Sequence, residues 1–198
     1  EKEGFEVTYL PVDETGLVSM ADLLHEIRPD TILVSIMAVN NEVGTIQYLR
    51  AIGEIVKDFK AYFHTDAVQA LGVMDIDVEE MHIDLMSMSS HKLHGPKGVG
   101  ALYVKKGTPI KKIMFGGEQE KNKRGGTLNV PAIVGFGKAV ESTKRDLKAI
   151  NKKLKEITNY FEKKMEYEIP DIKFNGNPKQ KAPGIVNISF NNIDNESI

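Results

Sequence analysis

Short apolar runs, separated by polar and helix-like segments, constrain the fold of this chain more than any other feature. The most continuous of these runs is rich in β-branched residues and predicts a buried strand. The predicted strands lie at residues 31–39, 61–65, 85–89 and 100–104. Strands that alternate with helices in this way predict an α/β layered fold.

Two helices are predicted before the third strand. Ser19 followed by Asp22 resembles a capping box, which predicts a short helix through Ile27. Apolar residues recur at helical spacing in residues 49–60, so this segment is predicted to form an amphipathic helix.

The last third of the chain changes character. Residues 130–165 predict one long helix or two in series, with a single apolar stripe that indicates a surface helix rather than a coiled-coil partner. After Pro170 the pattern returns to strands, clearest at residues 185–190. We therefore expect residues 1–140 to be part of a large domain. Residues 141–198 are expected to be a linking helix and the start of a small α+β domain.

The bulk properties exclude several classes of function. The formal net charge of −2 gives no electrostatic reason to bind nucleic acid or an anionic membrane. No apolar run approaches the roughly 18 residues of a membrane span, and residues 1–4 are too polar for a secretory signal. We expect a cytoplasmic protein. The absence of cysteine excludes disulfides, thiolate metal sites and a cysteine nucleophile within these residues.

Both ends of the sequence suggest a piece of a longer protein. The chain does not begin with Met, and it enters a strand-like run at residues 7–10 almost at once. Residues 191–198 resemble the approach to another structural element.

Polar clusters follow three of the predicted strands, at residues 40–42, 66–69 and 89–92. In open α/β sheets, ligands bind in the crevice beyond the carboxyl ends of the strands. Separate strands can therefore deliver these clusters to one site.

Lys92 is the residue in these clusters with the clearest chemistry. It follows a predicted strand and precedes a turn that contains Gly95 and Gly98, where the backbone can approach a ligand closely. A desolvated lysine near cationic groups has a lowered pKa and can form an imine with an aldehyde cofactor. The alternative is an ordinary solvated lysine.

The other clusters supply groups that such a cofactor would need. Asp66 could cap a helix, or it could pair with a pyridine nitrogen and keep it protonated. Gln69 and Asn41 could hydrogen-bond a phenolic oxygen of the cofactor. Ser89 and His91 could bind phosphate. A second phosphate candidate is residues 124–127, Arg-Gly-Gly-Thr, which precede a predicted helix start.

Other readings of these polar residues are weaker. His91 and His94 lack a third ligand at a suitable spacing for a metal. The acidic residues 75–80 lack the glycine and spacing of an EF-hand loop, which favours a solvated face. His64 and His82 are expected to be structural histidines.

Four ordered motifs resemble one known family. They are residues 40–44 (Asn-Asn-Glu-Val-Gly), 64–69 (His-Thr-Asp-Ala-Val-Gln), 89–98 (Ser-Ser-His-Lys, then Gly-Pro-Lys-Gly) and 124–127. Their order and spacing resemble those of the NifS/IscS-type cysteine desulfurases, which are class V aminotransferase-like enzymes dependent on pyridoxal 5'-phosphate (PLP). The resemblance covers nearly the whole chain, including residues 176–197.

The resemblance implies a fold, a cofactor and roles for individual residues. The fold is the fold-type I large domain, with three αβα layers around a mostly parallel sheet. Lys92 would hold PLP as a Schiff base and shuttle protons, and Asp66 would face the pyridine nitrogen. Gln69 and Asn41 would lie at the phenolic oxygen, and Ser89 and His91 at the phosphate. Thr127 would reach the phosphate of a neighbouring subunit, so that a homodimer shares its active sites.

The implied activity removes sulfur from L-cysteine and leaves alanine and an enzyme persulfide, with an iron–sulfur scaffold protein as a possible acceptor. Several family features are missing here. The persulfide cysteine and the substrate-binding arginine lie later in the family pattern, and the histidine that stacks on the cofactor lies before Glu1. Residues 116–120 also depart from the family version. We therefore expect this segment to be inactive by itself. The alternatives are a selenocysteine lyase, another class V enzyme, or a non-catalytic PLP-binding or structural fragment.

Overall fold

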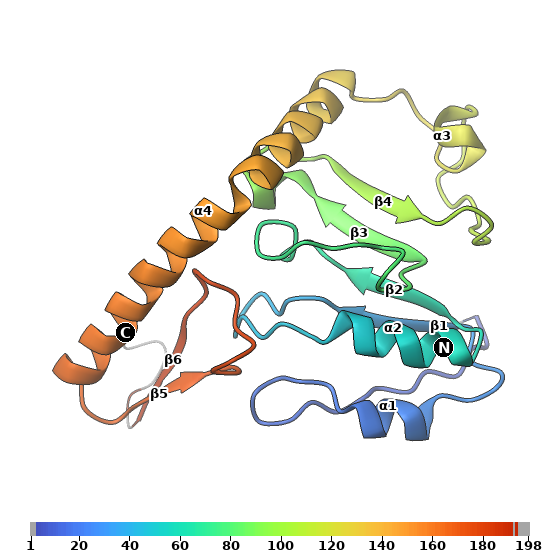
Figure 1. Cartoon of the computed structure of the whole chain (residues 1–198). Helices are drawn as coiled ribbons and strands as arrows, with labels where there is room; N and C mark the ends of the chain where they lie inside the picture. Colours follow the sequence, from blue (N-terminus) through green and yellow to red (C-terminus); the bar gives the residue numbers. More distant parts are fainter. Residues whose placement is uncertain (1–2, 192, 194–198) are drawn as a thin grey trace.

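A four-stranded sheet forms the centre of the computed structural model, which describes residues 3–191 and residue 193. Its strands, in spatial order, are β1 (Leu33–Met37), β2 (Tyr62–Asp66), β3 (Leu85–Ser89) and β4 (Gly100–Val104). The first three strands are parallel, and β4 runs antiparallel to β3. The predicted α/β fold with a mostly parallel sheet is confirmed (Figure 1).

Two helices cover one side of this sheet. Helix α1 (Met20–Glu26) begins after Ser19, whose hydroxyl accepts a hydrogen bond from the Asp22 backbone N–H at 3.2 Å, as the capping pattern predicts. Helix α2 (Leu49–Asp58) packs on β2 and on α1. Both helices lie close to their predicted positions because their apolar stripes meet the same core.

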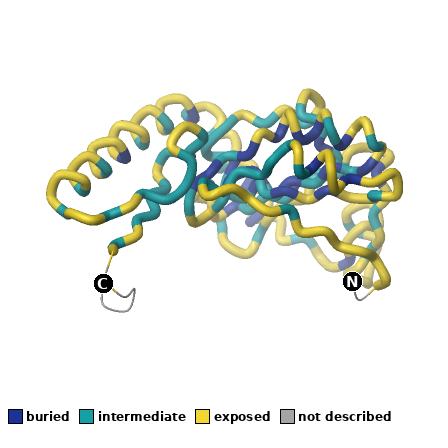
Figure 2. The backbone as a smooth tube through the Cα atoms, turned by 90° about the horizontal axis from the view of Figure 1, so that it is seen from below, coloured by how far each residue is buried: buried dark blue, intermediate teal, exposed yellow. Residues whose placement is uncertain are grey.

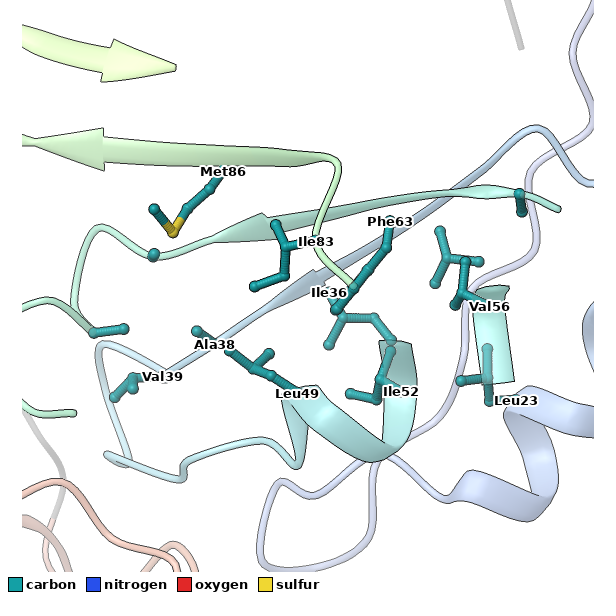
Figure 3. Packing of buried hydrophobic residues seen from close by; sticks show 14 of the residues in the cluster. Leu23, Ile36, Ala38, Val39, Leu49, Ile52, Val56, Phe63, Ile83 and Met86 are labelled. Carbon is teal, nitrogen blue, oxygen red and sulfur yellow. The ribbon is translucent and has the colours of Figure 1, made fainter. Parts of the chain in front are cut away.

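The core lies between α2 and the sheet (Figure 3). Phe63 of β2 is fully buried against Ile52 of α2 and against Ile83 of the segment before β3. Gly53 allows α2 to approach this segment, because a Cβ atom there would lie 2.0 Å from the Met81 carbonyl oxygen. Truncating a buried side chain such as Ile52 to alanine typically costs about 2–5 kcal/mol.

The opposite face of the sheet is only partly buried. Side chains alternate across a strand, so Leu33 and Ser35 of β1 point away from α2, and Leu33 is 50% exposed. The prediction of a buried strand over residues 31–39 is therefore wrong for this face. It fails because a cavity, lined by residues 4–10 and by β1 itself, lies against β1 where a packed layer would be needed, and the regular strand is shorter than predicted.

The expected strand at residues 7–10 is also absent from the described structure. These residues run alongside β1 but are separated from it by a cavity of about 1110 Å³. Without a paired neighbour, a strand-like sequence gains none of the ladder hydrogen bonds that stabilise a strand.

The C-terminal third forms an arm beside the sheet. Helix α4 (Val130–Glu168) is one continuous helix of 39 residues, capped by the Asn129 side chain. Most of its surface is exposed (Figure 2). It is followed by an antiparallel pair, β5 (Ile172–Asn175) and β6 (Asn187–Phe190). A return to strands after Pro170 is thus confirmed, although the resemblance that runs to residue 197 extends past the described residues.

The arm contacts the loop that follows β1. The Ile46 N–H donates to the Gln180 carbonyl at 2.9 Å, and the Ala182 N–H donates to the Gly44 carbonyl at 2.8 Å. Residues 180–182 therefore act as a short extra strand against residues 44–46, which fixes the loop that carries Asn41.

No helix within residues 3–191 combines the length and the apolar character that a membrane crossing requires.

Candidate functional site

The carboxyl ends of β1, β2 and β3 lie at one edge of the sheet. In the strand register, Met37 pairs with Asp66, and Asp66 pairs with Ser87. The polar clusters at residues 40–42, 66–69 and 89–92 therefore leave the sheet at a shared edge, as the sequence predicts. We call this the carboxyl edge, and the side chains of these clusters form the candidate site.

Asp66 is the last residue of β2 and is half-buried. Its Oδ1 atom accepts a hydrogen bond from the Val68 backbone N–H at 2.9 Å. Within the described residues, its second carboxylate oxygen has no hydrogen-bonding or ionic partner. No helix follows Asp66, so the helix-cap alternative does not apply. The carboxylate is oriented by one bond and keeps one oxygen available for a ligand.

Lys92 lies on η1 (Ser90–Leu93), a single turn of 3-10 helix directly after β3. Ser90 and Leu93 are buried and anchor this turn, and α4 packs against it. The Lys92 side chain is exposed, and its amine forms no ion pair or hydrogen bond with any other described residue. A rigid backbone thus presents a free amine at the carboxyl edge.

Ser89 and His91 lie on either side of buried Ser90. The Ser89 hydroxyl is 2.8 Å from Nδ1 of the His91 ring. A hydroxyl and an imidazole this close together can both donate to an anion such as phosphate.

Neighbouring asparagines after β1 differ in how they are bonded. Asn40 Oδ1 accepts from the backbone N–H groups of Glu42 and Val43, each at 2.9 Å. The exposed Asn41 amide and the half-buried Gln69 amide form no hydrogen bonds with other described residues. Asn40 therefore shapes the loop, whereas Asn41 and Gln69 are free for a ligand.

Thr127 is not brought to the carboxyl edge by any contact of the described structure. It lies in an exposed loop between α3 (Gln119–Asn122) and α4. In Figure 1, α3 lies beyond the end of β4, which runs antiparallel to β3, and so away from the carboxyl edge. Arg124 precedes Thr127 in the same exposed loop.

His64 takes part in a side-chain network that the sequence did not reveal. Its Nδ1 atom is 2.8 Å from the Ser35 hydroxyl on β1, and its Nε2 atom is 2.9 Å from the Ser87 hydroxyl on β3. Burial lowers the pKa of His64 below its ordinary value, and the charge of Asp66 opposes this shift. The available signal was a serine inside each neighbouring apolar strand, but the register between the strands was needed to connect them.

The weaker readings also have structural outcomes. Asp77 Oδ1 accepts from the backbone N–H groups of Glu79 and Glu80, so this acidic stretch forms a loop and a solvated face. The His82 Nε2 atom lies 3.0 Å from Glu54 Oε1, so this histidine has a side-chain partner on α2. Across residues 3–191, no group of metal-binding side chains is gathered in one place.

Comparison with known proteins gives a consistent family. The family model described as aminotransferase class-V matches residues 1–198. A cysteine desulfurase IscS from Clostridium botulinum (strain Hall) is 51% identical over 201 residues, covering 100% of this chain and 50% of that protein. A mitochondrial cysteine desulfurase from Candida maltosa is 46% identical over 202 residues, covering 100% and 42%.

Solved structures agree with the sequence comparison. A structure titled NifS-like protein superposes with a TM-score of 0.93 at 39% identity, covering 97% of this chain and 53% of that one. The chain thus spans about half the length of the relatives it matches.

Proposed function

Because the chain belongs to the class V aminotransferase family, we propose that it forms the cofactor-binding part of a PLP-dependent cysteine desulfurase. Such an enzyme is a sulfur transferase that takes sulfur from L-cysteine and leaves alanine. The observation that carries the proposal is the carboxyl edge. There the unpaired amine of Lys92 follows β3, and Asp66, with one unbonded carboxylate oxygen, ends the adjacent parallel strand β2.

The polar groups at the carboxyl edge match the parts of PLP. The free oxygen of Asp66 suits a protonated pyridine nitrogen, and Gln69 and Asn41 suit the phenolic oxygen. Ser89 and His91 suit the phosphate. When bound, PLP would supply an electron-withdrawing ring that stabilises negative charge at the substrate Cα.

Lys92 and Asp66 would then each have a defined task. Lys92 would attach the cofactor covalently through its amine and would move a proton to and from the substrate. Asp66 would hold the proton on the pyridine nitrogen, because a carboxylate beside it favours the protonated form. The buried neighbours of Lys92 would keep its backbone fixed while its side chain moves.

Thr127 would act in a homodimer, where it reaches the phosphate bound to the neighbouring subunit. Large apolar side chains on the chain segments before and after this loop support an interface, since Ile113 is 83% exposed, Phe115 82% and Val134 65%. Large apolar side chains this exposed are candidates for a protein–protein contact. A size measurement in solution, with Phe115→Glu as the disrupting variant, tests this assignment.

The wider biological context is also proposed. We infer a cytoplasmic location. The Candida maltosa relative is named as mitochondrial, and cell fractionation distinguishes the two locations. We infer a division between residues 1–140 and 141–198, which would fall within α4. The sulfur acceptor would be an iron–sulfur scaffold protein.

One observation favours a second candidate, a PLP-binding or structural piece without activity. The chain contains no cysteine, so it cannot carry the persulfide that the family uses. Joining this chain to the remaining half of a relative, and testing the product for activity, distinguishes this candidate from the enzyme.

Covalent trapping tests cofactor binding. The chain is incubated with PLP, reduced with borohydride and digested, and the modified lysine is located by mass spectrometry. We expect modification at Lys92, loss of modification in Lys92→Ala, and no loss in the matched control Lys97→Ala. Labelling spread over surface lysines, with Lys92 not preferred, would contradict the proposal.

A chimera tests the activity. This chain replaces the aligned segment of the Clostridium botulinum relative, which then supplies the remaining half. We expect alanine to be released from L-cysteine, and we expect Lys92→Ala within the chimera to abolish that release. A folded chimera that binds PLP but releases no alanine would support the non-catalytic alternative.

A further inference from the structure

His64 lies on the same face of β2 as Asp66. The two residues are separated by one position on a strand, and side chains alternate between the faces of a sheet. The residues that flank His64, Phe63 and Thr65, are fully buried on the opposite face, which packs toward α2. His64 and Asp66 therefore share the half-buried face that ends at the carboxyl edge.

Both nitrogens of the His64 ring are hydrogen-bonded to serine hydroxyls. The Ser35 hydroxyl on β1 lies 2.8 Å from Nδ1, and the Ser87 hydroxyl on β3 lies 2.9 Å from Nε2. A hydroxyl can donate or accept, so a neutral imidazole satisfies both contacts by donating to one serine and accepting from the other. We call this chain of side chains across three parallel strands the Ser–His–Ser ladder.

The ladder determines which donors remain for Asp66. Ser87 pairs with Asp66 in the register of β2 and β3, so its hydroxyl is a side-chain donor on the neighbouring strand beside Asp66. That hydroxyl is bonded to His64 instead. Asp66 accepts only the backbone N–H of Val68 among the described residues.

We propose that His64 is a positioning residue that keeps the Asp66 carboxylate available for the cofactor, by staying neutral and by occupying the Ser87 hydroxyl beside it. This inference rests on the proposed function, and it adds to that function a residue that does not touch the cofactor. A charged ring at position 64 would attract the carboxylate and compete with the pyridinium for it. The burial of His64, which disfavours its charged form, is consistent with this role.

Two substitutions at one position test the proposal. In His64→Ala, the freed Ser87 hydroxyl can donate to Asp66, and we expect PLP to bind at least about tenfold more weakly, the effect expected of one hydrogen bond to a charged group. We expect the pyridine nitrogen of ¹⁵N-labelled PLP to shift toward its unprotonated position. In His64→Gln, a neutral amide that both donates and accepts should restore most of the affinity and the shift.

Ser35→Ala is the matched control for a purely structural role. It removes a hydroxyl from the ladder but leaves Ser87 bonded to His64, so we expect PLP affinity to stay within about threefold of the unmodified chain. The proposal is overturned if Ser35→Ala weakens PLP as much as His64→Ala does. It is also overturned if His64→Ala leaves both the affinity and the ¹⁵N shift unchanged. Thermal unfolding of each variant confirms that a folded protein was measured.

A measurement without cofactor separates this proposal from the proposed function. The ¹⁵N shifts of the His64 ring in the chain alone should show a neutral imidazole with one protonated and one unprotonated nitrogen at neutral pH. If the unmodified chain fails to bind PLP while the ring is neutral, the proposed function fails and the ladder stands. A doubly protonated ring would overturn the positioning role whether or not PLP binds.

Discussion

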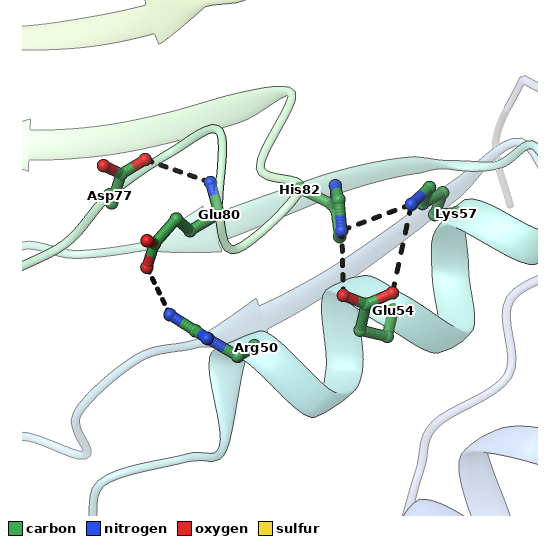
Figure 4. A network of polar contacts seen from close by, with 6 residues as sticks. All are labelled: Arg50, Glu54, Lys57, Asp77, Glu80 and His82. Atoms are coloured by element: carbon green, nitrogen blue, oxygen red, sulfur yellow. Dashed lines mark hydrogen bonds and ion pairs between the residues drawn. The ribbon is translucent and has the colours of Figure 1, made fainter.

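The molecule has two polar clusters that are organised in opposite ways. Beside α2, a surface cluster consists of two separate groups of paired side chains (Figure 4). Arg50 pairs with Glu80, whose backbone N–H donates to Asp77. Glu54 contacts both Lys57 and His82. At the carboxyl edge, Lys92, Asn41 and Gln69 have no partner among the described residues.

The surface cluster contributes slightly to stability, whereas the carboxyl edge is arranged to bind a ligand. Charges that pair with one another on an exposed surface gain little, typically 0.2–1 kcal/mol per pair. Polar groups held on a rigid frame without partners gain nothing in the free protein, but they are already in place for a ligand. The hydrogen-bond and ion-pair partners of the side chains show which cluster is already satisfied and which is open to a ligand.

Replacing matched aspartates should separate the clusters most strongly. Asp66→Asn keeps an oxygen for the Val68 N–H but removes the charge, so we expect PLP affinity or chimera activity to fall roughly 10²–10³-fold. Asp77→Asn, which likewise keeps an acceptor for its loop, should leave PLP binding unchanged. Titration of PLP by absorbance measures both variants. Equal losses would show that the carboxyl edge is no more specialised than the surface cluster.

Adjacent asparagines test the same contrast inside one loop. Asn40→Ala removes the acceptor of two backbone N–H groups, so we expect it to lower the free energy of unfolding by about 1–2 kcal/mol. Asn41→Ala breaks no bond to a described residue and should leave stability unchanged while weakening PLP. Urea unfolding and PLP titration measure the two effects. A stability loss in Asn41→Ala as large as that in Asn40→Ala would contradict the assignment of Asn41 to ligand binding.

The pattern of apolar and polar residues along the chain was sufficient to predict much of the sheet. The bounds of β3 and β4 were predicted correctly, because Asp84 and Ser90 flank the first run, and Gly100 and Lys105 mark the ends of the second. Helix α2 was predicted from its apolar stripe. These features depend on neighbours within a few positions, so they can be read along the chain.

The features that the sequence did not show depend on residues far apart. Whether residues 7–10 form a strand depends on a paired neighbour. One face of β1 stays exposed because a cavity lies there instead of a packed layer. The motifs indicated Asp66 and Lys92 as a possible site. They did not show that His64 bonds Ser35 and Ser87, because those residues meet only through the register of three strands.

The pH dependence of stability tests the ladder independently of any ligand. Burial makes the folded protein bind a proton at His64 less readily than the unfolded chain does. The stability from the neutral ring is therefore complete above the ordinary histidine pKa of about 6.5, and it declines as the pH falls through that value toward the lower folded pKa. The slope should stay well below about 1.4 kcal/mol per pH unit, because the ring is partly exposed.

Urea unfolding between pH 8 and pH 5.5 measures this slope. We expect His64→Gln to flatten the curve in that window, since the amide does not titrate. The two clusters can be compared directly with His82→Gln, which removes the histidine of the surface cluster. If His82→Gln flattened the curve as much as His64→Gln, the ladder would have no special place in the stability of the sheet.

The smallest effect is expected in the surface cluster itself. Arg50 and Glu80 form an ion pair between two largely exposed side chains, so Glu80→Gln should change the free energy of unfolding by about 0.2–1 kcal/mol. The change should shrink in high salt, because exposed charges are screened there. Urea unfolding at low and high salt measures it, and PLP binding should be unaffected. A loss of PLP binding in Glu80→Gln would mean that the surface cluster communicates with the carboxyl edge through α2 and β2, and the separation drawn between the two clusters would fail.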